Sequence, residues 1–195
     1  MTPAKIKRSV GKEPFLYPLP VLLVATYDQS GKANVMNAAW GGICSSDPVS
    51  LSVAIRPSRH THDALLARKA FTVGIASQQM VKEADYVGMV SGSREDKFAN
   101  AGFTEVKAEK VDAPYVAECP VVLECSLTGS LDLGAHTLMI GAIEDVKIDE
   151  DCLDAGKPML EKIAPLVFDA GGGHYYAVGA KVAQAFYVGR ELIKK

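Results

Sequence analysis

The sequence predicts a mostly β fold with short helices, in which long antiparallel strands close into a barrel. Two long segments, 120–131 and 136–148, alternate apolar with polar residues and are separated by four turn residues. This is the pattern of an antiparallel hairpin. A second hairpin is predicted from 15–27 and 33–40, because the turn between them contains Gly31, which can adopt a positive φ.

The segment 49–55 is predicted to be a strand with two different faces. Its odd positions are branched and apolar, whereas Ser50, Ser52 and Ala54 are small. The small face either meets solvent or leaves room for a flat molecule against the sheet. The other predicted elements are a helix 62–69 with Thr61 as its N-cap, a strand 70–76, a helix capped by Ser77 and ending at Gly88, a short helix between Ser93 and Gly102, and a last strand 180–188.

Composition indicates one soluble globular domain, residues 1–195. Apolar residues make up 48% of the 195 and charged ones 23%, which excludes a disordered chain. A net charge of −2 gives no excess of positive charge for nucleic acid, and the apolar run 21–25 is too short for a membrane span. The four cysteines form no C-x-x-C pair, which favours reduced thiols and a cytoplasmic protein.

Two segments contain residues suited to ligand binding. Arg56, Ser58, Arg59 and Thr61 place guanidiniums and hydroxyls where a helix begins, which suits a phosphate monoester; the alternative is an ordinary basic turn. The segment 34–42 is crowded with Asn, Ala and Gly. Its small residues either expose backbone groups to the edge of a planar heterocycle or only permit close strand packing.

Other motifs give weaker indications. The glycine run 171–173 has no following Lys and Ser/Thr, so it is predicted to be a loop and not a phosphate cradle. His60 and His62 have the spacing of metal ligands on a strand, but no third ligand follows at a useful distance. Cys44 has no local signature of a nucleophile.

Eight short pieces in one order resemble the flavin reductase-like, FMN-binding split-barrel family, and within it the flavoredoxin group. They are YPLPV (17–21), YDxxGKxN (27–34), NAAWGGIC (37–44), SDP (46–48), KAFTV (69–73), KEADY (82–86), DKF (96–98) and VDAPYV (111–116). The resemblance covers nearly the whole chain. It implies a six-stranded antiparallel split β-barrel that forms a homodimer, with FMN held non-covalently at or near the subunit interface.

The resemblance also implies which residues contact the cofactor. Asn37, Ala38, Ala39 and Trp40 match the strand that lies along the isoalloxazine ring, and Cys44 belongs to the same piece. The other cofactor-binding residues it implies are Arg56, Ser58 and Thr61 near the phosphate, Ser77 as a further hydroxyl, and Lys97 as an ammonium close to the flavin. His136 matches the histidine of a Gly-Asp-His hairpin that contacts nicotinamide, but here the preceding residue is Ala135.

The function implied is electron transfer through bound flavin by a flavin reductase-like oxidoreductase. Either NAD(P)H delivers hydride to flavin N5, or a redox protein supplies electrons that the flavin relays. The missing Asp before His136 puts direct use of NAD(P)H in question. Two alternatives are a non-catalytic flavin- or ligand-binding module, and a metal-binding cupin-like barrel that uses His60, His62 and His174.

Overall fold

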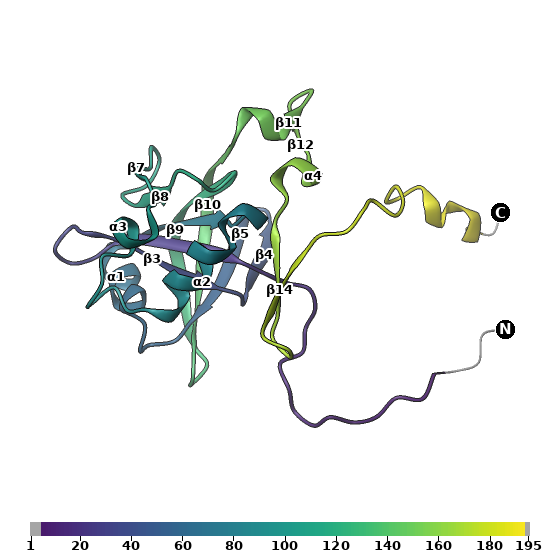
Figure 1. The fold of residues 1–195 in the computed structure, drawn as a ribbon, viewed down its shortest axis with the longest axis horizontal. Coiled ribbons are helices and arrows are strands. Elements are labelled where there is room, and N and C mark those ends of the chain that lie inside the picture. Colours follow the sequence, from purple (N-terminus) through teal and green to yellow (C-terminus); the bar gives the residue numbers. More distant parts are fainter. Residues whose placement is uncertain (1–4, 194–195) are drawn as a thin grey trace.

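The computed structural model describes residues 5–193, and its body is one seven-stranded antiparallel sheet curved into an open barrel (Figure 1). The hydrogen-bonded order is β3-β2-β6-β9-β10-β5-β4, so β3 and β4 are the two edges. The strands are β2 (Leu22–Tyr27), β3 (Ala33–Ala38), β4 (Gly41–Ser46), β5 (Val49–Ile55), β6 (Ala70–Ile75), β9 (Val121–Asp132) and β10 (Thr137–Ile148). The predicted fold class, mostly β with short helices, is confirmed.

Both predicted hairpins are present, as β2–β3 and β9–β10. The main sheet has seven strands where six were expected, because residues 41–46 form a further strand that pairs with β5. Its glycines and serines have low β propensity. The strand exists because the neighbouring backbone of β5 offers hydrogen-bond partners along its whole length.

The helices are short and lie outside the sheet. They are α1 (His60–Arg68), α2 (Val81–Met89), α3 (Lys97–Ala101) and α4 (Leu160–Ile163), with 3₁₀ turns η1 (Gln78–Met80), η2 (Glu150–Cys152) and η3 (Val188–Leu192).

Two cap predictions were wrong: Arg59 is the N-cap residue of α1, and Asp96 rather than Ser93 caps α3 by accepting from the Ala99 N–H at 3.1 Å. Ser77 is the N-cap residue of η1, which leads directly into α2, but its side chain makes no cap bond. Thr61 is buried within α1, and its hydroxyl accepts a hydrogen bond from Asn34 instead.

Smaller sheets flank the body, and the predicted strand 180–188 is not among them. Residues 178–184 have no regular secondary structure and 185–187 form a turn, because no strand of the described chain lies beside them. The last strands are instead β13 and β14. The small-sheet strands are β1 (Leu19–Pro20), β13 (Leu166–Asp169) and β14 (His174–Ala177), then β7 (Glu105–Lys107) with β8 (Pro114–Val116), and β11 (Leu153–Asp154) with β12 (Lys157–Pro158).

The core has two parts because β2 is buried on both faces. One face, with Leu22 and Val24, packs inside the barrel against Phe71. The other, with Leu23, belongs to a second cluster that includes residues of α2 and α3. β3 therefore lies beside β2 at the sheet edge, with one face toward the barrel interior and the other toward α2. This position makes β3 the floor of the clefts described below.

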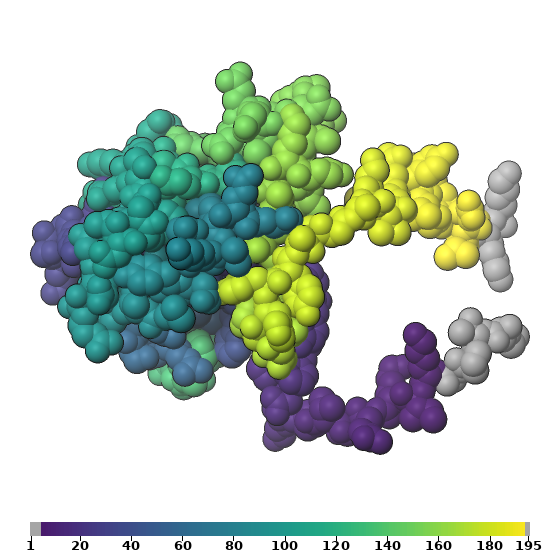
Figure 2. All heavy atoms as spheres, viewed as in Figure 1, coloured from purple at the N-terminus to yellow at the C-terminus, as the bar shows by residue number. Residues whose placement is uncertain are grey.

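Two terminal arms, residues 5–18 and 178–193, leave the body on the same side (Figures 1 and 2). Apolar side chains on both arms are exposed to solvent: Ile6 is 100% exposed, and Val182 and Phe186 are each 97% exposed. Exposed apolar residues gathered on one side of a molecule are candidates for an interaction surface. None of the helices in residues 5–193 has the length and apolar character needed to cross a bilayer.

Candidate functional site

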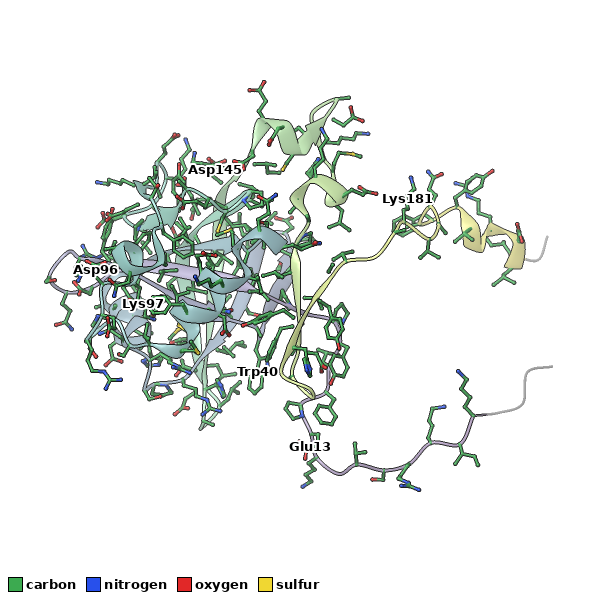
Figure 3. All side chains as sticks on the ribbon, viewed as in Figure 1. Glu13, Trp40, Asp96, Lys97, Asp145 and Lys181 are labelled. Carbon is green, nitrogen blue, oxygen red and sulfur yellow. The ribbon has the colours of Figure 1, made fainter. Side chains whose placement is uncertain are left out.

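Two clefts lie next to β3 and share two lining residues, Met36 of that strand and Arg59. The first, here the Trp40 cleft, has a volume of about 150 Å³ and is lined by Met36, Asn37, Ala38, Ala39, Trp40, Ala54, Arg56, Arg59 and His136. The second, the Lys97 cleft, has a volume of about 40 Å³ and is lined by Met36, Ser58, Arg59, His60, Thr61, Val87, Gly88, Val90, Ser91, Gly92 and Lys97. Figure 3 shows Trp40 on the side from which the arms leave and Lys97 farther from the arms.

The Lys97 cleft carries strong positive charge in a buried setting. Lys97 is 5% exposed, and its Nζ donates to the carbonyl oxygen of Val87 at 2.8 Å. Burial, with a smaller contribution from the nearby Arg59 guanidinium, lowers its pKa from 10.5 to about 8. An ammonium has three donors, so an anion in the cleft would find N–H groups and two positive charges.

Helix α1 adds backbone donors to the same cleft. It begins at His60, and the side chain of its N-cap residue Arg59 does not cover the first turn. Free N–H groups at a helix N-terminus favour anions. Ser58 and Thr61 line the cleft here with their hydroxyls, and Thr61 Oγ1 already accepts from Asn34 Nδ2 at 2.7 Å.

One buried polar atom beside this cleft has no protein partner. Asn34 Oδ1 is buried and accepts no hydrogen bond from any residue of 5–193. Gly92 lies against it so closely that a Cβ there would clash with the amide oxygen. An unpaired buried acceptor is costly, which makes it suited to a hydroxyl donor from a ligand or solvent.

The Trp40 cleft is lined by small residues together with two arginines and two aromatic rings. Ala38 and Ala39 contribute only methyl groups, while the Trp40 ring lies 4.7 Å from the His136 ring between centroids, tilted by 41°. Arg56 Nε donates to His136 Nε2 at 3.3 Å. Burial, and then the charge of Arg56, lowers the pKa of His136, so the ring is neutral and its Nε2 is the acceptor.

The structure thus brings together most of the residues predicted from sequence. Asn37, Ala38, Ala39, Trp40, Arg56 and His136 line the Trp40 cleft, and Ser58, Thr61 and Lys97 line the Lys97 cleft. Two do not join them. Cys44 is exposed on β4, and Ser77 forms an isolated bridge with Pro165 and lines neither cleft.

The two arginines of the predicted phosphate turn lie at different places. Arg56 lines the Trp40 cleft with His136, apart from Ser58 and Thr61, whereas Arg59 lines both clefts. Sequence reasoning also missed Gly88 and Gly92 at the end of α2. Two glycines spaced by four residues around a helix end are the only signal that indicated close backbone approach there.

The three histidines of the metal-binding alternative do not come together. Both ring nitrogens of His62 are engaged, with Asp63 at 2.7 Å and Thr137 at 2.8 Å. His60 Nε2 lies 3.5 Å from an oxygen of Asp28, and His174 is exposed on β14. They form no common site in the described part of the chain.

Comparisons with known proteins agree on one family. A family model described as a flavin reductase like domain matches residues 15–178. A flavoredoxin of Desulfovibrio vulgaris (Miyazaki F) is 45% identical, with a TM-score of 0.91 over 94% of this chain and 100% of that one. A flavoredoxin of Methanosarcina acetivorans is 31% identical, with a TM-score of 0.89 over 97% and 100%. A high molecular weight rubredoxin of Moorella thermoacetica is 28% identical over 76% of this chain and 60% of its own.

Proposed function

The chain belongs to the flavin reductase-like family, and from this premise we propose that it binds FMN non-covalently along β3 and passes electrons through it. The resemblance to flavoredoxin predicted from sequence is confirmed by the 45% and 31% identical structures. The family supports a flavin as the cofactor and oxidoreduction as the class of activity. The choice of FMN, the residues that hold it and the electron donor are our proposals.

One observation supports FMN above all: the two joined clefts differ in chemistry. The Lys97 cleft combines Arg59 and Lys97 with residues that carry hydroxyls, whereas the Trp40 cleft combines its two arginines with small residues and two aromatic rings. FMN has a matching asymmetry, with a phosphate dianion at one end and a planar tricycle at the other. Between them it carries the ribityl hydroxyls, which are donors of the kind that Asn34 Oδ1 lacks.

Each residue then has a defined task. Arg59 and Lys97 neutralise the phosphate through charge-assisted hydrogen bonds, and Ser58 adds a hydroxyl donor. Ala38 and Ala39 let the ring approach the backbone of β3. A bound flavin supplies the redox chemistry, since its ring takes up and releases one or two electrons. Arg56 places a permanent positive charge at the ring end, which favours the more negative reduced form.

We favour a protein electron donor over NAD(P)H. His136, the residue expected to contact nicotinamide, accepts from Arg56 and packs on Trp40 within its own chain, and no Asp precedes it. The relative named as a high molecular weight rubredoxin is by name a redox protein, which supports a relay between proteins. The four free cysteines support a reducing compartment, and we propose the cytoplasm.

We also propose that the protein is a homodimer. The two arms, residues 5–18 and 178–193, carry exposed apolar side chains such as Ile6 and Phe186, and a second copy placed on the arm side would cover them. Burial of such residues contributes roughly 25 cal/mol per Å² of apolar surface.

Titration of the purified, flavin-free protein with FMN and with riboflavin tests the proposal. The Lys97 cleft predicts that FMN binds at least tenfold more tightly, because riboflavin lacks the phosphate. Equal affinity, or no binding of either, would refute the assignment. The bound flavin is then mixed with NADH, NADPH or reduced rubredoxin: fast reduction by a nicotinamide would contradict the relay, and resistance to every donor and to dithionite would favour a non-catalytic module.

A further inference from the structure

The side chain of Asn37 is held by groups from two distant elements. Its Nδ2 donates to the carbonyl oxygen of Ala84 in α2 at 2.9 Å and lies 3.5 Å from the hydroxyl oxygen of Tyr175 in β14. The Tyr175 hydroxyl in turn donates to Asp85 Oδ1 at 2.9 Å. Gly88 of the same helix packs closely on Asn37, since a Cβ added to this glycine would lie 3.2 Å from the Cβ of Asn37.

This chain of hydrogen bonds has a fixed direction. A carboxylate only accepts hydrogen bonds, so the Tyr175 hydroxyl must donate to Asp85. Its oxygen is then available to Asn37 as an acceptor. Burial, followed by the bond to Asp85, raises the pKa of Tyr175 to about 12, so the hydroxyl keeps its proton at neutral pH. The Ala84 carbonyl also only accepts. Both contacts therefore fix the nitrogen of the amide on the α2 side.

The orientation of the amide decides what Asn37 offers to a ligand. Asn37 lines the Trp40 cleft, and with its nitrogen held by Ala84 and Tyr175 the amide atom that accepts no hydrogen bond within residues 5–193 is the oxygen, Oδ1. Were the amide reversed, the cleft would present an N–H donor instead. An acceptor and a donor at this position select ligands of opposite hydrogen-bonding character.

We propose that Tyr175 and Asp85 are positioning residues that hold Asn37 as an acceptor for a ring N–H of the bound flavin. The N–H of the oxidised ring lies on its pyrimidine edge, at N3, so this acceptor selects rings that keep that hydrogen. The proposal rests on the proposed function, since it presumes flavin in the Trp40 cleft. Neither Tyr175 nor Asp85 lines that cleft, and both act through Asn37.

The test compares Tyr175→Phe with Tyr176→Phe, a matched control on the neighbouring, exposed residue of the same strand. Each protein is titrated with FMN and with 3-methyl-FMN, which lacks the N–H, and the ratio of the two Kd values is the readout. The preference of the wild type for FMN should shrink by roughly three- to tenfold in Tyr175→Phe and stay unchanged in Tyr176→Phe. A purely structural role would weaken both ligands equally and leave the ratio unaltered.

Asp85→Asn provides a second, independent variant. Its amide can donate to the Tyr175 oxygen, so Tyr175 no longer has to donate to residue 85, and the Ala84 carbonyl is then the one fixed acceptor that remains for Asn37 Nδ2. The same loss of preference is expected, with a shift in the absorption maximum of bound flavin. An unchanged Kd ratio in either variant that still binds FMN overturns the positioning role. A wild type that binds no flavin overturns the proposed function itself, a result that the wild-type titration shows before any variant is made.

Discussion

The Lys97→Met variant distinguishes the effect of this side chain on the stability of the flavin-free protein from its effect on the affinity for FMN. Lys97 is 5% exposed, and its pKa is lowered from 10.5 to about 8. At 1.36 kcal/mol per pKa unit, keeping the ammonium charged in the folded, flavin-free protein costs about 3 kcal/mol. Its hydrogen bond to the Val87 carbonyl stabilises the folded protein by about 1 kcal/mol. Methionine fills the same space without the charge, so flavin-free Lys97→Met should be about 2 kcal/mol more stable than the wild type at pH 7.

The pH dependence of stability provides an internal check. Between about pH 8 and 10.5 the unfolded chain still holds the Lys97 proton, whereas the folded chain has lost it. The free energy of unfolding of the wild type should therefore rise over this window, as the cost of burying the charge is relieved. Lys97→Met should lack this rise. The matched control is Lys82→Met, which removes an exposed lysine of α2 and should change neither quantity.

Flavin binding should respond in the opposite sense. Loss of a charge-assisted contact to phosphate is worth roughly 1.5–3 kcal/mol, or about ten- to a hundredfold in the Kd for FMN. A phosphate beside Lys97 also raises the pKa of the ammonium, so the affinity of the wild type for FMN should fall above about pH 8. Urea titration and flavin fluorescence quenching measure the two effects. A Lys97→Met protein that is less stable without flavin, or that binds FMN as tightly as the wild type, would refute the reasoning.

Four further substitutions test the remaining assignments. Arg59→Gln should weaken FMN about tenfold or more by calorimetry while riboflavin binding changes little; a uniform loss would contradict the phosphate role. Arg56→Gln should lower the midpoint potential of bound flavin in a spectroelectrochemical titration with less effect on affinity. Glu124→Gln should destabilise the fold by about 3 kcal/mol in urea, because the fully buried carboxylate accepts the Lys110 N–H at 2.6 Å and lies 3.4 Å from Lys147 Nζ. Phe186→Asp should shift the mass by light scattering from twice 20.8 kDa to 20.8 kDa, while Leu133→Asp on a hairpin tip leaves it unchanged.

Alternation of apolar residues predicted the parts of the fold whose burial is set locally. The hairpins β2–β3 and β9–β10 and strand β5 follow from period-two patterns and turn residues. β4 could not be predicted, because its Gly and Ser residues become a strand only through pairing with β5. The segment 180–188 has the opposite property: its apolar residues suggest a strand, but no neighbouring strand is present in the described chain.

The predicted helix starts were wrong for a related reason. A hydroxyl before an apolar run predicts an N-cap, yet the Thr61 hydroxyl pairs with Asn34, 27 residues earlier. Competition of this kind depends on tertiary packing and leaves no local signal. The same holds for Arg56 and Arg59, which sequence alone cannot distinguish. The two residues are three positions apart across a turn. The Arg56 guanidinium contacts His136, whereas Arg59 lines both clefts.

The separation of charges along β3 implies that affinity and redox potential can be changed independently. Lys97 lines only the cleft that suits a phosphate, a group that keeps its charge during electron transfer. The contribution of Lys97 is therefore equal in both redox states and strengthens binding without altering the potential. Arg56, at the end with Trp40 and His136, faces the part of the ligand whose charge changes. Only a group at that end stabilises one redox state over the other, so a sequence that varies Arg56 while keeping the Lys97 cleft would retain the cofactor and change its potential.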